Sequence, residues 1–306
     1  MILVDNKNNT NPYINAALEE YLVRNADTSE HDYLLLYVNE PCVVLGKNQS
    51  LYKELNFNFL REESTKIVRR ISGGGTVFHD SGNLCFAFIS KFEEKKINNY
   101  AYFNQPIIHA LQHMGVNATF NKRNDIVLNG KKISGNAQFT NRKNIISHGT
   151  LLFNADLENL RGALKENSFT VESKAVSSVK SSVMNLNEVL ELNFEEFKNQ
   201  LLISLNSSGK LQLDSIAWDE INQLAEEKFN SFDWIYGRSP LTTIHKEKLT
   251  ITVEKGDILS LEIKDPDFSF LEKIIGCQYS FLSIKKRLQE LNITAYSLSE
   301  LTEIIF

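Results

Sequence analysis

The stretch RRISGGGTVFHD, residues 69–80, constrains the fold most, because three consecutive glycines stand between two segments typical of strands. Glycine loses more backbone freedom on folding than any other residue, so such a run indicates a turn with positive φ or a close approach to the backbone. Because strands flank it, the run is a connection and not the start of a helix. It matches neither G-x-x-x-x-G-K-[ST] nor G-x-G-x-x-G, which excludes a Walker loop and a Rossmann fingerprint. A plain glycine-rich hairpin and an anion-binding backbone remain open.

Two arginines, Arg69 and Arg70, precede the glycine run. They occupy successive positions of the expected strand, so their side chains point to opposite faces of the sheet. Only one of them can therefore share the face of the glycine loop, and the other lies on the far side.

The segment NDIVLNGKKIS contains the strongest hairpin signal, because Asn129-Gly130 between apolar-alternating runs is typical of a type I′ turn. The expected pairs are Leu128–Lys131, Val127–Lys132, Ile126–Ile133 and Asp125–Ser134. Strand alternation then places Lys132 with Asp125 on a polar face, and places Lys131 on the core face near the turn. Asp125 and Lys132 are diagonal neighbours, about 7–8 Å apart at Cα. A solvated ion pair contributing about 0–1 kcal/mol is the ordinary outcome for such charges.

The whole chain has 306 residues and a net charge of −5, with no apolar run long enough for a membrane span. This charge does not favour non-specific binding to nucleic acid or to an anionic membrane. Its first residues lack the pattern of a signal or transit peptide. Cys42, Cys85 and Cys277 are widely scattered, so we expect free thiols in an intracellular, cytoplasmic protein, with Cys85 in the core.

The length suggests two domains, and the pattern of elements predicts an α+β fold with mixed β-sheets flanked by helices. KLTITVEKGDILSLEI reads as a hairpin, and FSFLEKIIGCQYSFLSIKKRLQEL, residues 268–291, reads as one helix. Ser297 with Glu300 fits the capping box of a last short helix. We therefore divide the chain into a large domain, residues 1–245, and a small α+β domain, residues 246–306.

Two other signals carry little weight. His109 and His113 have the i, i+4 spacing of helical metal ligands but no third ligand, so we expect a surface pair. His79-Asp80 lacks a G-x-S-x-G elbow, and no cysteine between residues 86 and 276 could serve beside Lys132. Covalent catalysis through a protein nucleophile is therefore poorly supported.

Four ordered blocks resemble the lipoate–protein ligase A family of the biotin/lipoate ligase superfamily. They are RRISGGGTVFHDSGNL, RNDIVLNGKKISGNAQ, SHGTLLFNADL and SSVKSSVMNL. Weaker similarity extends over nearly the whole chain. The resemblance is weakest at VKSSV, where Lys180 and Ser182 stand in place of arginines, and in the short C-terminal region, whose rotation during catalysis stays open.

The resemblance implies a catalytic domain over residues 1–245 with an accessory domain after it. It implies that ATP and Mg²⁺ convert lipoate to lipoyl-AMP, and that a lysine of an acceptor protein then takes the lipoyl group. The implied nucleotide contacts are Arg70, Gly75, Thr76, Val77, Phe78, Asn124, Asp125 and Lys132, with Asp125 as a Mg²⁺ ligand and Lys132 as the catalytic residue. The implied lipoate contacts are Ser72, Gly73, Gly74, His79, Lys132, His148 and Gly149.

The implied partners are lipoyl domains of 2-oxoacid dehydrogenase E2 subunits and the glycine-cleavage H-protein, with no nucleic acid or membrane, and we expect a monomer. Three alternatives stay open. An octanoyl- or lipoyltransferase would need a cysteine near Lys132, and a biotin ligase would carry G-R-G-R-x-G where this chain has S-G-G-G. A non-catalytic lipoate-binding protein would have little need of a phosphate-facing cation.

Overall fold

The computed structural model describes residues 1–121, 123–164, 169–293 and 296–306. Within them the strands form four sheets. The six-stranded sheet has the order β10-β11-β6-β2-β1-β13. Its strands are β1 (Ile2–Val4), β2 (Tyr33–Tyr37), β6 (Asn83–Lys91), β10 (Asn136–Thr140), β11 (Asn144–Leu152) and β13 (Gly209–Leu211). This mixed sheet with helices on it confirms the predicted α+β class.

Both faces of the six-stranded sheet are buried, because alternate residues of β6 pack against different helices. Leu84, Phe86 and Phe88 face a core shared with α4 (Tyr100–His113) and α6 (Phe194–Leu205). Cys85, Ala87 and Ile89 face the opposite core, which is shared with α1 (Pro12–Asn25), α7 (Ser215–Leu224) and the π-helical turn η3 (Ala225–Phe229). The face on the α1 side also carries the polar residues of the site described below.

The glycine run lies in a three-stranded sheet of order β4-β3-β5. Its strands are β3 (Cys42–Leu45), β4 (Lys66–Arg69) and β5 (Val77–His79). β3 lies between the other two, parallel to β4 and antiparallel to β5. The run therefore crosses from one edge of the sheet to the other, and the plain hairpin is excluded.

The predicted hairpin is present in the sheet β7-β8-β9, formed by β7 (Thr119–Phe120), β8 (Ile126–Leu128) and β9 (Lys131–Ser134). Positive φ at Asn129 and Gly130 fits the expected turn, and the two pairs next to it are confirmed. The two outer pairs are wrong, because a β-bulge makes Ile126 pair with Ser134. β9 also forms hydrogen bonds along its other edge, where Lys132 N–H donates to Ser182 O. The bulged strand β9 therefore has a neighbour on each side.

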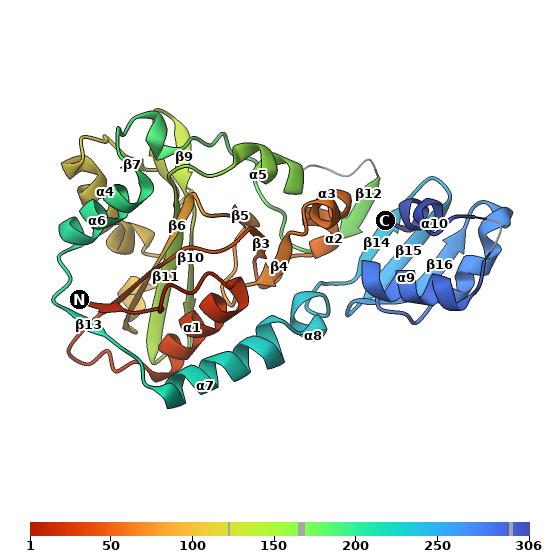
Figure 1. Ribbon diagram of the computed structural model, residues 1–306, viewed down its shortest axis with the longest axis horizontal. Coiled ribbons are helices and arrows are strands. Elements are labelled where there is room, and N and C mark those ends of the chain that lie inside the picture. Colours follow the sequence, from red (N-terminus) through yellow and green to blue (C-terminus); the bar gives the residue numbers. More distant parts are fainter. Residues whose placement is uncertain (122, 165–168, 294–295) are drawn as a thin grey trace.

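The C-terminal sheet has the order β12-β14-β15-β16. Its strands are β12 (Thr170–Ser173), β14 (Thr242–His245), β15 (Leu249–Glu254) and β16 (Asp257–Ile263). The hairpin β15–β16 is confirmed, with positive φ at Lys255 and Gly256. Figure 1 shows this sheet with α9 (Phe281–Glu290) and α10 (Leu298–Ile305) at one end of the molecule, reached through α8 (Phe232–Ile235). The division after residue 245 stays a prediction.

The single helix predicted over residues 268–291 is wrong. The chain forms a 3₁₀ segment, η4 (Pro266–Ile274), and then α9. Gly276 between them has φ of 81°, which ends the helical path as a glycine in the left-handed region does. The capping box of Ser297 and Glu300 is confirmed at the start of α10.

The remaining short elements complete the chain. They are α2 (Leu51–Glu54), α3 (Phe57–Glu62), η1 (Glu94–Lys96), α5 (Leu157–Ala163) and η2 (Leu186–Glu188). None of the helices in the described parts of the chain combines the length and the apolar character of a membrane-spanning segment. The three cysteines are unpaired, and Cys85 is buried as predicted.

Candidate functional site

Two neighbouring cavities, of about 520 and about 1120 Å³, share Lys132 in their walls. The smaller one is lined by both the six-stranded sheet and the sheet β4-β3-β5. The expected site residues that line it are Arg70, Gly74, Gly75, Thr76, Val77, His79, Asn124, Asp125, Lys132, His148 and Gly149. The structure therefore brings together most of the residues that sequence reasoning selected from three separate segments.

Three expected residues lie elsewhere. Ser72 is buried behind the smaller cavity, and the carbonyl of Gly73 accepts from Arg70. Phe78 lines the larger cavity, and its side chain belongs to a hydrophobic core that continues into the C-terminal sheet. These three positions support the walls of the site more than they line the smaller cavity.

Lys132 lies where the hairpin meets both cavities. Its Nζ atom is 2.8 Å from Asp125 Oδ1, so the predicted proximity of the two side chains is confirmed. Asp125 is buried and also accepts from Asn121 Nδ2 at 3.3 Å. A Cβ at Gly135 would lie 2.9 Å from Lys132 Nζ, so a side chain at this position would displace the end of Lys132. The Lys132 ammonium is thus held beside Asp125, at the point where the two cavities meet.

Arg70 fixes the glycine loop from within. Its guanidinium donates to the carbonyls of Val44, Gly73 and Gly75 and to Ser72 Oγ. Burial lowers the pKa of Arg70 to about 10, so the group still carries its charge at neutral pH. Among the described residues no carboxylate forms an ion pair with Arg70, so it brings a positive charge to the wall of the smaller cavity.

Gly74 shows why the loop needs glycine. Its φ is 92°, which side chains rarely adopt, and a Cβ there would lie 2.9 Å from Arg70 Nη2. Arg69 turns to the other side and donates to the carbonyls of Gln49 and Ile235. The prediction that only one of the two arginines faces the loop is confirmed.

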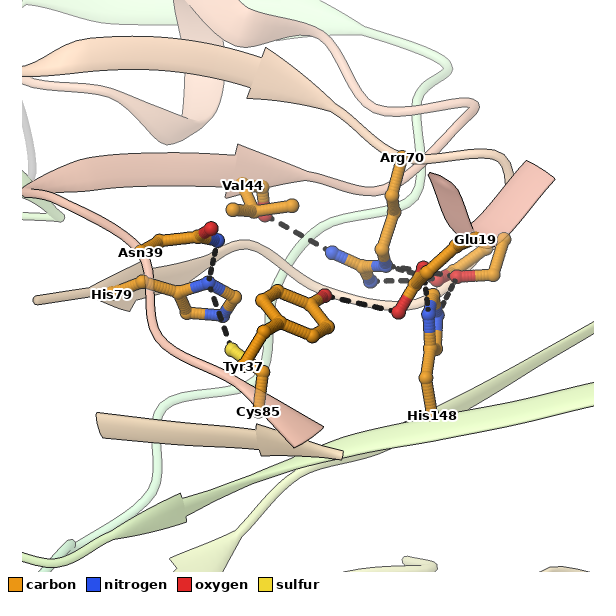
Figure 2. Close-up of polar contacts among 10 residues, drawn as sticks. Glu19, Tyr37, Asn39, Val44, Arg70, His79, Cys85 and His148 are labelled. Atoms are coloured by element: carbon orange, nitrogen blue, oxygen red, sulfur yellow. Dashed lines mark hydrogen bonds and ion pairs between the residues drawn. The ribbon is translucent and has the colours of Figure 1, made fainter. Parts of the chain in front are cut away.

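A buried chain of hydrogen bonds connects α1 to Arg70, and Figure 2 shows it. Glu19 Oε2 lies 2.7 Å from His148 Nδ1, and His148 Nε2 lies 2.6 Å from Ser72 Oγ. Tyr37 O–H donates to the second oxygen of Glu19 at 3.0 Å. Ser72, His148 and Glu19 have the distances of a catalytic triad. However, Ser72 is 1% exposed and accepts from Arg70 Nε, so the chain positions Arg70 and does not present a nucleophile.

Sequence reasoning missed Glu19 and Tyr37. The one available signal was a carboxylate beside the apolar stripe of the first helix, since a fully buried glutamate needs a partner. Its partner His148 lies 129 residues further along the chain, so no local pattern could connect them.

The loop at residues 176–181 closes over the glycine run and lines both cavities. Thr76 N–H donates to Ser178 Oγ at 2.8 Å, and Gln49 Nε2 donates to the same atom at 3.1 Å. Ser178 N–H and O–H both donate to the carboxylate of Glu54. Hydrogen bonds of Ser178 therefore join this loop to the edge of the site.

The discounted histidines behave as predicted, because His109 and His113 are exposed on α4. No group of three or more His, Cys, Asp or Glu side chains is placed to hold a metal ion within the part of the chain that the structure describes.

Cys85 lines the smaller cavity, but burial raises the pKa of its thiol well above the usual value. It is therefore not a thiolate nucleophile at neutral pH.

Comparison with known proteins shows the class and then the family. Residues 11–206 match the model of the lipoyl protein ligase A/B catalytic domain. A lipoate–protein ligase of Bacillus subtilis is 39% identical, over 97% of this chain and 96% of its own length. Lipoate–protein ligase 1 of Staphylococcus aureus is 36% identical over the same shares. The protein is thus an enzyme of the ligase class. It belongs to the lipoate–protein ligase family.

Solved structures confirm the fold. P. falciparum LipL1 in complex with lipoate matches with a TM-score of 0.66 at 23% identity, over 99% of this chain and 98% of its own. The putative lipoate–protein ligase Ta0514 of T. acidophilum has a TM-score of 0.67 at 20% identity, over 77% of this chain and 98% of its own.

Proposed function

We propose that this ligase works in two steps around Lys132. In the first, a carboxylate oxygen of lipoate attacks the α-phosphorus of ATP, and pyrophosphate leaves as lipoyl-AMP forms. In the second, the amine of an acceptor lysine attacks the lipoyl carbonyl, AMP leaves, and the amine loses its proton to solvent. The observation that carries the proposal is the position of Lys132 in the walls of both cavities.

The physical basis is electrostatic. Two anions repel each other as they approach, so joining them needs a fixed cation between them. A lysine ammonium is a compact point charge, and Asp125 holds this one in place at 2.8 Å. No protein nucleophile is needed, because lipoate itself attacks. Catalysis is then mainly positioning and charge stabilisation.

The two cavities suggest how the substrates are distributed. The smaller holds lipoate, with its carboxylate at Lys132 and its chain passing Gly74, His148 and Gly149 towards His79. The larger holds the nucleotide, against Thr76, Val77 and Phe78. Arg70 and the backbone of Gly75 add positive charge and N–H donors where the adenylate forms.

Mg²⁺ would enter with ATP. This ion binds through one or two carboxylates together with substrate phosphates and water. Asp125 provides a buried carboxylate in the wall of the smaller cavity, with Asn124 beside it, which fits such a site. When bound, the ion would neutralise charge on the phosphates.

The partner in the second step is a lipoyl domain of an E2 subunit or the glycine-cleavage H-protein. Support comes from the names of the relatives and from a T. acidophilum neighbour described as a bi-partite lipoate–protein ligase with its E2 lipoyl domain. We further propose that the protein acts as a monomer in the cytoplasm.

Mass spectrometry of an acceptor tests the function. With ATP, Mg²⁺ and lipoate, the purified chain should add one lipoyl group to an isolated E2 lipoyl domain. A domain with its acceptor lysine changed to arginine should gain nothing, and biotin should not replace lipoate. Absence of the modification despite tight lipoate binding would contradict the ligase and favour a non-catalytic binding protein.

A further inference from the structure

The Ser178 hydroxyl has a full set of hydrogen bonds. Its oxygen accepts from Thr76 N–H at 2.8 Å and from Gln49 Nε2 at 3.1 Å. The orientation of the Gln49 amide is fixed, because Gly46 N–H donates to its oxygen at 2.9 Å. A serine hydroxyl has two lone pairs and one hydrogen. Both lone pairs of Ser178 are therefore used, and its hydrogen has to be donated to another group.

Glu54 accepts that hydrogen. The Ser178 hydroxyl donates to Glu54 Oε2, and Ser178 N–H donates to Oε1 of the same carboxylate at 3.2 Å. Hydrogen bonds to a charged acceptor are stronger than those between neutral groups. A glutamine in this place would offer one acceptor oxygen and would turn an NH₂ group towards one of the two donors. The carboxylate of Glu54 therefore holds both the side chain and the backbone of Ser178.

The glycine run leaves room for this serine. A Cβ at Gly75 would lie 3.1 Å from Ser178 Oγ and 3.4 Å from Ser178 Cα, so a side chain there would push the loop away. Thr76, whose N–H donates to Ser178, follows directly in the chain. The last glycine of the run thus permits the close approach of a loop that lies 102 residues after Thr76.

Glu54 belongs to a well-supported element. It ends the short helix α2, and Figure 1 shows this helix beside the C-terminal sheet. Ser50 Oγ, at the start of α2, lies 2.8 Å from Thr242 Oγ1 of β14, and both residues are fully buried. The ring of Tyr52 packs against that of Tyr279, with 5.1 Å between the ring centroids. The Glu54 carboxylate therefore extends from a backbone that is fixed on the side away from the loop.

The same segment of chain, residues 176–184, continues to Lys132. Lys132 N–H donates to the carbonyl of Ser182 at 2.8 Å, and Met184 N–H donates to the carbonyl of Lys132 at 3.1 Å. Between these bonds and Ser178, the segment lines both cavities through Val179 and Ser181. The position of Ser178 therefore sets where this shared wall lies relative to the glycine run and to Lys132.

We propose that Glu54 is a positioning residue of this ligase, which acts through Ser178 to hold residues 176–184 over the place where lipoyl-AMP forms. The proposal rests on the proposed function. A shared wall in a fixed position aligns the two substrates and keeps water from the mixed anhydride. When the wall is released, the oxygen of a water molecule bonds to the lipoyl carbonyl carbon and the bond to AMP breaks. Lipoate, AMP and a proton then leave without transfer.

The test compares Glu54→Gln, which has nearly the size of the native side chain, with wild type. The variant should lower kcat/KM for ATP in lipoate-dependent ATP–pyrophosphate exchange about tenfold. The AMP released per lipoyl group transferred to a lipoyl domain should be about one in wild type and severalfold higher in the variant. Glu62→Gln, the same change at an exposed position of α3, should match wild type in both measurements.

A second variant tests the route through Ser178. Ser178→Ala removes the hydroxyl, so it should give the same kind of loss as Glu54→Gln. The double variant should lose no more than Ser178→Ala alone, because the two side chains act as one unit. Losses that multiply would mean that Glu54 acts independently of Ser178, and would overturn the proposal. An AMP ratio that stays at about one, while transfer and pyrophosphate exchange fall together, would also overturn it, because a merely destabilised protein behaves in that way.

Hydrogen–deuterium exchange of the ligand-free chain separates this inference from the ligase proposal. Residues 176–184 should take up deuterium faster in Glu54→Gln than in wild type, and Glu62→Gln should not differ. If wild type shows no pyrophosphate exchange, the ligase proposal fails, yet faster uptake in the variant still supports the attachment through Glu54. If wild type is active and the uptake is equal in the two proteins, the ligase proposal stands and the role of Glu54 is overturned.

Discussion

Arg69 and Arg70 are adjacent in sequence, similarly buried and bound mainly to neutral carbonyls, yet they hold different regions. Arg69 joins β4 to the turn at Gln49 and to α8, through the carbonyl of Ile235. Arg70 holds the glycine loop and lines the cavity. Burial lowers the pKa of both to about 10. Burial and hydrogen bonding therefore do not distinguish the two arginines, whereas contact with a ligand-sized cavity does.

The largest effect is expected at Lys132, which lies in the walls of both cavities. Lys132→Ala should lower lipoate-dependent ATP–pyrophosphate exchange by about 10²–10³-fold, because it removes the charge between the two anions. Circular dichroism should show a folded protein. Lys131→Ala is the matched control, since Lys131 is exposed at the turn, and it should be nearly silent. Similar losses in both variants would mean that the site is assigned to the wrong lysine.

Substitution of the two arginines tests the comparison itself. Arg70→Met should reduce exchange by about 10²-fold in the folded protein, by removing positive charge from the cavity. Arg69→Met should leave exchange per folded molecule near the wild-type value, but should lower the free energy of unfolding by about 3 kcal/mol, because several buried carbonyls lose their donor. Urea denaturation and exchange on the same samples measure both. If Arg69→Met lost activity without losing stability, the division of roles would be incorrect.

A smaller effect is expected at Asp125, which positions Lys132 without bearing the positive charge. Asp125→Asn keeps the size of the side chain and should lower exchange about tenfold. If the Asp125 carboxylate binds Mg²⁺, the exchange rate of the variant should also depend less on the Mg²⁺ concentration. An unchanged magnesium dependence would limit Asp125 to the positioning of Lys132.

The smallest effect concerns the stability of the protein in acid and the buried side chain of His79. His79 has a pKa lowered to about 3 in the folded chain, against an ordinary value near 6.5. Between these values the unfolded chain binds one more proton, so His79 makes the protein less stable as the pH falls below about 6.5, by roughly 1 kcal/mol per pH unit. Against wild type, His79→Phe should gain relative stability from pH 7 to pH 4. Parallel unfolding curves across this range would contradict the buried neutral imidazole.

Local patterns predicted much of the site. Asn129-Gly130 set the turn, and strand alternation selected Lys132 and Asp125, which meet at 2.8 Å. The outer hairpin register could not be predicted, because the bulge accompanies pairing of β9 with residues 182–184. The break at Gly276 was overlooked because the apolar periodicity on both sides of it looks continuous.

The hydrogen-bond chains behind the cavity required the tertiary structure. Glu19 reaches His148 across 129 residues, and Asn39 reaches His79 across 40. Such contacts join α1 and the segment after β2 to strands much later in the chain, so no short window of sequence contains both partners. The resemblance to a known family selected His148 and His79 but gave neither of these partners.

The most direct measurement is ATP–pyrophosphate exchange by the purified wild-type chain, without any acceptor protein, in the presence and absence of lipoate and with biotin as the control acid. The account predicts exchange that requires lipoate, since adenylate formation needs only the two substrates and the cation between their cavities. Exchange that is absent although lipoate binds would contradict the central claim that Lys132 joins two anions in this chain.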